Sequence, residues 1–132
     1  MENINKKLFF NKFQTKKLIY KSKLSLVYEG INIKENEPVA IKLKKRTGLE
    51  NLDKEKFILF NLKGFGIPKI LACGKNKFYN ILVEELLGMS LLKIWEFKKN
   101  INLRIKNACM VAIQALDRLE YIHSKNYIHK TK

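Results

Sequence analysis

Two charged side chains stand where their types and spacing could form an ion pair. Lys42 lies in the segment 38–43, in which alternate residues are apolar and Lys42 falls on the other parity. Glu55 lies in the segment 49–62, whose leucines recur at helical intervals, and it projects from the apolar face of that predicted helix. A carboxylate there is costly unless a cation meets it, so an ion pair with Lys42 is one interpretation. The other is that both are solvated surface charges.

The elements that must position these residues follow an α+β order. Alternating apolar residues and polar turns indicate strands, and wider apolar spacing indicates helices. Strands are expected at 17–20, 25–33, 38–43, 70–73 and 79–83, and helices at 49–62, 90–98 and 103–123.

The composition excludes several classes of protein. The chain has 132 residues, enough for one domain, and its 46% hydrophobic content is too high for a disordered tail. No apolar stretch is long enough to span a bilayer. Cys73 and Cys109 lack the spacing of a disulfide framework or a zinc site, so no metal is expected and a cytoplasmic or nuclear location is predicted.

The net charge of +15 raises the question of a nucleic-acid partner. Lysine supplies 24 of the 27 basic residues, and it is spread along the whole chain. Only Arg46, Arg104 and Arg118 carry the guanidinium fork that favours phosphate and base recognition. The sequence therefore favours solvated lysine-rich faces over a dedicated nucleic-acid patch, and electrostatic binding to nucleic acid or an anionic membrane ranks behind the two functions given below.

Four blocks of sequence, in order, resemble the protein kinases. Residues 39–42 read Val-Ala-Ile-Lys, as in the third strand of that family, and Glu55 follows at a suitable distance. Residues 66–68, 79–91 and 121–129 are similar to the loop before the fourth strand, the hinge region and the approach to the catalytic loop of casein kinase I. The resemblance covers about residues 15–132.

The resemblance implies a fold and a division of the chain. Residues 1–14 would be an N-terminal extension, and residues 15–88 a kinase-like small lobe and hinge, with a five-stranded antiparallel sheet and one helix. Residues 89–132 would be two helices from the truncated start of the large lobe.

The resemblance also implies an ATP site. Lys42 would hold the α- and β-phosphates and pair with Glu55. Glu85 and Leu87 would offer backbone groups to the adenine edge. The apolar walls of the slot are expected from Val27, Ala40 and Leu91.

The glycine-rich loop of the kinases departs from the family pattern here. Tyr20, Ser22 and Ser25 occupy the three glycine positions, where side chains would obstruct the approach of the backbone to a phosphate. Lys21 and Lys23 could compensate electrostatically.

Two further departures affect the base pocket and the chemistry. Glu84 occupies the position at the back of the adenine pocket where the family has an apolar residue, unless a one-residue shift of register turns it outward. Thr131 stands in place of the catalytic Asp and cannot act as a base at neutral pH. No catalytic residue of the family is therefore intact. The family's Mg²⁺-binding motif, which follows the catalytic loop, does not occur in the 132 residues, so Mg²⁺ is not expected to bind to this chain alone.

Two kinds of function follow from these features. The first is a casein-kinase-I-like serine/threonine kinase fragment that binds ATP without transferring phosphate. The second is a non-catalytic, pseudokinase-like interaction module, or a truncated gene product without activity. The apolar face of the helix 103–123 would dock the interaction module onto a protein partner or onto itself.

Overall fold

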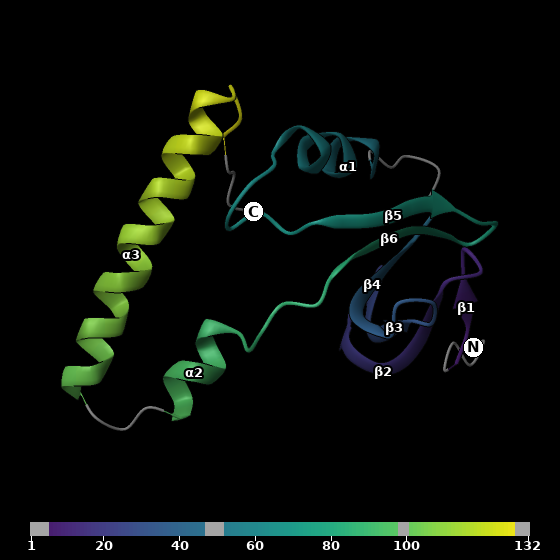
Figure 1. Cartoon of the computed structure of the whole chain (residues 1–132), viewed down its shortest axis with the longest axis horizontal. Coiled ribbons are helices and arrows are strands. Elements are labelled where there is room, and N and C mark those ends of the chain that lie inside the picture. Colours follow the sequence, from purple (N-terminus) through teal and green to yellow (C-terminus); the bar gives the residue numbers. More distant parts are fainter. Residues whose placement is uncertain (1–5, 47–51, 98–100, 129–132) are drawn as a thin grey trace. The chain divides into compact units, whose positions relative to one another are not determined.

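The structure is a computed structural model that describes residues 6–46, 52–97 and 101–128. The chain divides into two compact units, Met1–Leu87 and Gly88–Lys132. The elements, labelled in Figure 1, are β1 (Leu8–Phe9), β2 (Phe13–Lys21), β3 (Ser25–Asn32), β4 (Glu37–Lys45), α1 (Leu52–Asn61), β5 (Ile70–Lys75), β6 (Tyr79–Glu85), α2 (Leu91–Phe97) and α3 (Ile101–Ser124).

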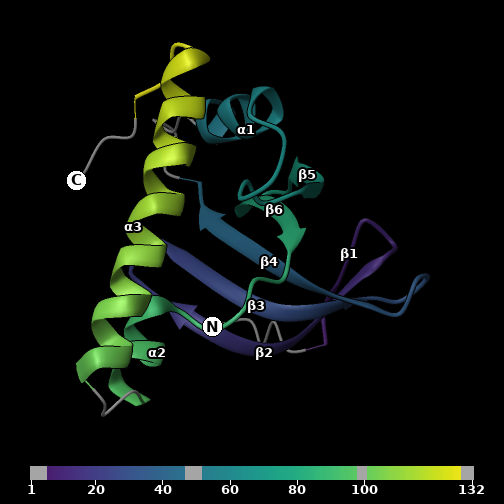
Figure 2. The ribbon, with the colours of Figure 1, turned by 60° about the vertical axis from the view of Figure 1, so that its left-hand side comes forward.

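All six strands of the first unit belong to one antiparallel sheet in the order β1-β2-β3-β4-β6-β5, and Figure 2 shows β2, β3 and β4 side by side. The α+β class and the antiparallel sheet are therefore confirmed. The predicted number of five strands is wrong, because Leu8–Phe9 pairs with Phe13 and Gln14 as an additional strand. Segment 1–14, set apart by the sequence as an extension, thus contributes β1 and the start of β2.

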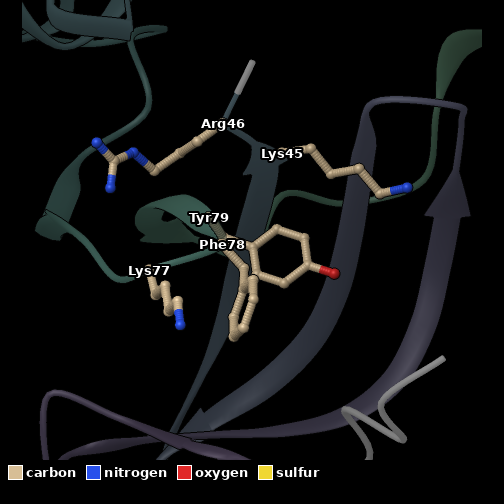
Figure 3. Close-up of a pocket in the computed structure, with 5 residues that line it drawn as sticks. All are labelled: Lys45, Arg46, Lys77, Phe78 and Tyr79. Atoms are coloured by element: carbon tan, nitrogen blue, oxygen red, sulfur yellow. The ribbon is translucent and has the colours of Figure 1, made fainter. Parts of the chain in front are cut away.

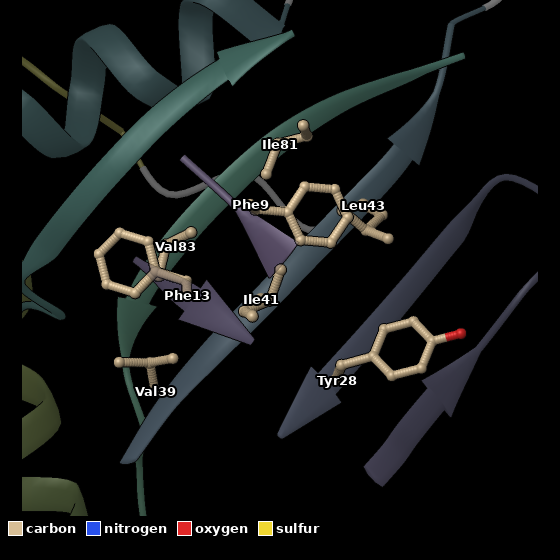
Figure 4. Close-up of a cluster of buried hydrophobic side chains, with 8 residues drawn as sticks. All are labelled: Phe9, Phe13, Tyr28, Val39, Ile41, Leu43, Ile81 and Val83. Atoms are coloured by element: carbon tan, nitrogen blue, oxygen red, sulfur yellow. The ribbon is translucent and has the colours of Figure 1, made fainter. Parts of the chain in front are cut away.

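The sheet curls because its first strands cover the apolar face of its central ones. Val39, Ile41 and Leu43 of β4 are completely buried on one face of the sheet. Phe9 of β1 and Phe13 of β2 pack in the same cluster, as Figure 4 shows, although β1 and β2 are not neighbours of β4 in the sheet. The whole cluster is Phe9, Phe13, Tyr28, Val39, Ile41, Leu43, Ile81 and Val83.

Two glycines allow close approach within this curled sheet. A Cβ at Gly30 of β3 would lie 2.6 Å from the backbone oxygen of Gln14 and 2.7 Å from Cδ1 of Ile41. A Cβ at Gly74 of β5 would lie 2.7 Å from Cε1 of Phe10, in the β1–β2 turn. Because β1 and β5 are the two edges of the sheet, the Phe10 contact joins its opposite ends.

A polar cluster closes the turn between β3 and β4. Glu35 accepts hydrogen bonds from Nζ of Lys12 at 2.9 Å and from Nδ2 of Asn32 at 2.6 Å. Asn32 is only 2% exposed, so its amide needs these partners, and its Oδ1 also accepts from the Lys34 amide at 3.2 Å. The cluster ties the start of β2 to the end of β3.

The helices form as the sequence predicts, with small changes of boundary. In the first unit, α1 lies beside β5 (Figure 1). In the second unit, the Ser90 hydroxyl accepts from the Lys93 amide and caps the start of α2, and the Arg104 guanidinium of α3 stacks over the Trp95 ring of α2 at 5.3 Å. Among the described residues, no helix is long and apolar enough to cross a membrane.

The Glu35 cluster predicts a pH dependence of stability. The hydrogen bond from Lys12 is the largest cause that lowers the pKa of Glu35 below its ordinary 4.5. A carboxyl group whose pKa is lower in the folded state stabilises the fold above its unfolded pKa, and this contribution is lost as the pH falls through the folded value. We therefore expect Glu35→Gln to lower the melting temperature at pH 7, and the difference from wild type to shrink as the pH falls below 4.5.

Thermal unfolding followed by circular dichroism across this pH range measures the difference. The matched control is Glu37→Gln, which removes a neighbouring exposed carboxylate at the start of β4. A Glu35→Gln difference that stayed constant from pH 7 to pH 3 would contradict the assigned role of the Lys12–Glu35 pair.

Candidate nucleotide site

The pairing of three strands brings several of the predicted ligand-binding residues onto one face of the sheet. Val27 of β3 lies opposite Lys42 of β4, and Glu29 of β3 lies opposite Ala40. Since side chains alternate along a strand, these residues point away from the core face that carries Ile41. Val27, Ala40 and Lys42 therefore lie together on the non-core face of β3 and β4.

The same pairing settles the direction of Glu84. Ala40 lies opposite Glu84 of β6, and Ile41 lies opposite Val83, which is fully buried in the core. Glu84 therefore shares the face of Ala40 and Lys42, and the shifted register that would turn it elsewhere is wrong.

Two carboxylates flank Ala40 on this face. Glu29 and Glu84 are its cross-strand neighbours on either side, and Ala40 itself is only 7% exposed. A base that reached Ala40 would first have to move the side chains that cover it. Glu29 was not singled out from the sequence, although its shared parity with Val27 was a visible signal of a common face.

Lys42 supplies the cation of this face. It is half-buried between its partners Val27 and Leu82 on the adjacent strands. Glu55 lies on α1, but its side chain is outside the described residues, as are all the atoms of Thr131, so neither the predicted ion pair nor the catalytic position is described.

The β2–β3 turn, where the sequence led us to expect the counterpart of a glycine-rich loop, closes without glycine. The Ser22 amide donates to the Ser25 oxygen at 2.8 Å, and the Ser25 amide donates to the Ser22 hydroxyl at 3.0 Å. All residues from 20 to 25 have negative φ, so side chains are accommodated without strain. Both serine amides are thus already bonded, and the side chains of Lys21 and Lys23 are exposed, so they could contact a phosphate.

The predicted hinge residues follow directly after this face. Glu85 ends β6; its amide donates to the Lys69 oxygen at 3.0 Å, and its Oε1 accepts from the Lys69 amide at 3.2 Å. Leu87 is 59% exposed at the end of the first unit. Leu91 begins α2 and belongs to the second unit.

The face can therefore offer the half-buried cations Lys42 and Lys44 and apolar contacts to a nucleotide, while its carboxylates oppose a polyanion. In the described residues, no group of three or more His, Cys, Asp or Glu side chains could hold a metal ion. A comparison of the chain with protein-family models finds no match.

The position of Glu84 predicts the effect of removing its charge. Glu84→Gln keeps the volume of the side chain and removes a negative charge from the face that carries Lys42. We expect a fluorescent ATP analogue to bind about fivefold more tightly, as for the loss of roughly 1 kcal/mol of repulsion. Fluorescence titration measures the dissociation constant. Glu37→Gln is the control for net charge, because Glu37 has the parity of Val39 and does not share the face of Glu84. Equal affinities of wild type, Glu84→Gln and Glu37→Gln would contradict this prediction.

Proposed function

We propose that this chain is a nucleotide-binding module similar to the small lobe of casein kinase I, which holds ATP on the non-core face of β3 and β4 and transfers no phosphate by itself. The observation that carries the proposal is the register of β4, because it gathers Val27, Ala40 and Lys42 on one surface. Ala40 and Lys42 share a face because they lie two residues apart on β4, and the pairing of β3 with β4 adds Val27 to that face.

The chemistry of the site supports binding more than turnover. The Lys42 ammonium can act as a point charge for phosphate oxygens, and the backbone after β6 can meet the edge of a base. The position that would carry the general base is Thr131, whose hydroxyl does not accept a proton at neutral pH. The proposal therefore includes no proton abstraction and no Mg²⁺ held by this chain alone.

Lys42→Met tests the binding proposal. We expect wild type to bind a fluorescent ATP analogue with or without Mg²⁺, and the variant to bind about tenfold more weakly, because a hydrogen bond to a charged group contributes roughly 1.5 kcal/mol. Lys44→Met is the matched control, since Lys44 lies on the same strand and face two residues further on. The absence of wild-type binding in every condition, or equal losses in the two variants, would overturn the proposal.

A second candidate function rests on α3 within the second unit. One stripe of this helix is exposed over more than half of each large side chain, Ile105, Ile113 and Leu116. Residues spaced in this way share a helix face, and a contiguous apolar stripe of this kind is typical of a docking surface. The proposal is that α3 associates with a partner protein or with a second copy of the chain.

Sedimentation velocity of the purified protein tests self-association directly. We expect wild type to sediment as dimers or larger species at micromolar concentration, and Ile113→Glu to shift it toward monomer, because a charge in the interface is left without a partner. Gln114→Glu adds the same charge one residue away, off the apolar stripe, and should leave the distribution unchanged. A wild-type monomer at all concentrations counts against self-association.

A further inference from the structure

A basic and aromatic cleft lies where β4 ends beside the β5–β6 turn. It is an open hollow of about 460 Å³. In Figure 3 the two aromatic rings lie between Arg46 and Lys77 on one side and Lys45 on the other. The lining residues are Lys45, Arg46, Lys77, Phe78 and Tyr79.

The turn that carries the rings is held in place by hydrogen bonds. Oδ1 of Asn76 accepts from the amides of Phe78 at 2.9 Å and Tyr79 at 2.7 Å. The backbone amide of Arg46 donates to the backbone oxygen of Phe78 at 3.0 Å, and Nη1 of the Arg46 side chain donates to the backbone oxygen of Asn76 at 3.1 Å. The cleft is therefore built before any ligand arrives, which lowers the entropic cost of binding.

The lining residues combine cations with an accessible ring. Three cations and no carboxylate are present among the described residues that line the cleft. The Phe78 ring is 54% exposed, and the Lys77 ammonium lies 5.8 Å from its centroid, whereas Tyr79 packs partly against the core. Phe78 thus offers a surface on which a flat, neutral group could stack beside phosphate-binding charges.

The described residues that line this cleft include none of those predicted for the ATP site, although Arg46 and Phe78, just beyond the last strand pair, have the parity of Lys42 and Leu82. Lys45 and Tyr79 lie opposite each other and share the parity of Ile41 and Leu43, so they extend the core face of the sheet at its open end. Lys42 has the other parity and lies on the other face.

We propose that this cleft binds single-stranded nucleic acid, with the backbone phosphates on the lysines and one base stacked on Phe78. A polynucleotide supplies both an anion and a planar ring within one repeating unit, which matches the lining. A phosphopeptide or an anionic lipid headgroup would use the cations and leave the exposed ring without a role. Folding has gathered cations that the sequence spreads evenly, which is why composition alone did not indicate this ligand.

Fluorescence anisotropy with a labelled ten-nucleotide RNA, and with DNA of the same sequence, tests the proposal. Phe78→Ala should weaken binding about tenfold, the loss expected for one stacked base. The double variant Lys45→Ala, Lys77→Ala should also reduce the slope of log K against log salt by about 1.4, since each phosphate on a single strand contributes about 0.7. Arg46 is left unchanged because its guanidinium holds the turn.

The matched controls remove equivalent groups elsewhere. Phe65→Ala removes a ring that is 83% exposed, and the double variant Lys16→Ala, Lys17→Ala removes two exposed lysines of β2. Binding of either RNA or DNA that falls with the cleft variants and not with the controls supports the site. Equal losses in cleft and control variants would show diffuse attraction by lysines, and binding only to phosphatidylserine vesicles would show a membrane ligand; both results overturn the proposal.

Discussion

The burial of Val39, Ile41 and Leu43 on one face of β4 is the constraint on which the rest of the sheet depends. Each of these side chains is completely enclosed, and a shift of one residue would expose all three while burying Lys42 and Lys44. Because β3 and β6 both pair with β4 over most of its length, the residues of β4 that face the core fix which residues of β3 and β6 face the core. The directions of Val27 and Glu84, and thus the composition of the candidate nucleotide face, follow from this apolar packing.

The two proposed ligand sites differ in the charges that surround their cations. On the non-core face, Lys42 is accompanied by the carboxylates of Glu29 and Glu84, so the local charge is mixed and affinity for a polyanionic nucleotide has to come from a few directed contacts. At the end of β4, Lys45 and Lys77 stand beside an exposed ring, and the described residues that line this cleft include no carboxylate. The attraction of an anionic ligand by these lysines therefore differs between the two sites, because it depends on the charges next to each lysine.

Most elements could be predicted from the sequence because their signals are local. The segments that became β3 and β4 alternate with period two, β6 is an apolar run after a polar turn, and α3 has a long apolar stripe with helical spacing. Leu8–Phe9 escaped prediction because two residues show no period, and because that strand exists through the burial of Phe9 against residues far along the chain. The direction of Glu84 was ambiguous for a related reason, since only the pairing with β4 distinguishes the two registers.

The sequence by itself determined the α+β class and the order of the helices and most strands, because periodicity and order along the chain are properties of the sequence. The tertiary structure alone decided that β1 joins the sheet and that Glu29 and Glu84 lie beside Ala40. It also brought Lys45 and Arg46 next to Lys77 and Phe78. These last residues are about thirty positions apart and come together only because β4 and β6 pair, which is a long-range interaction that no local pattern encodes.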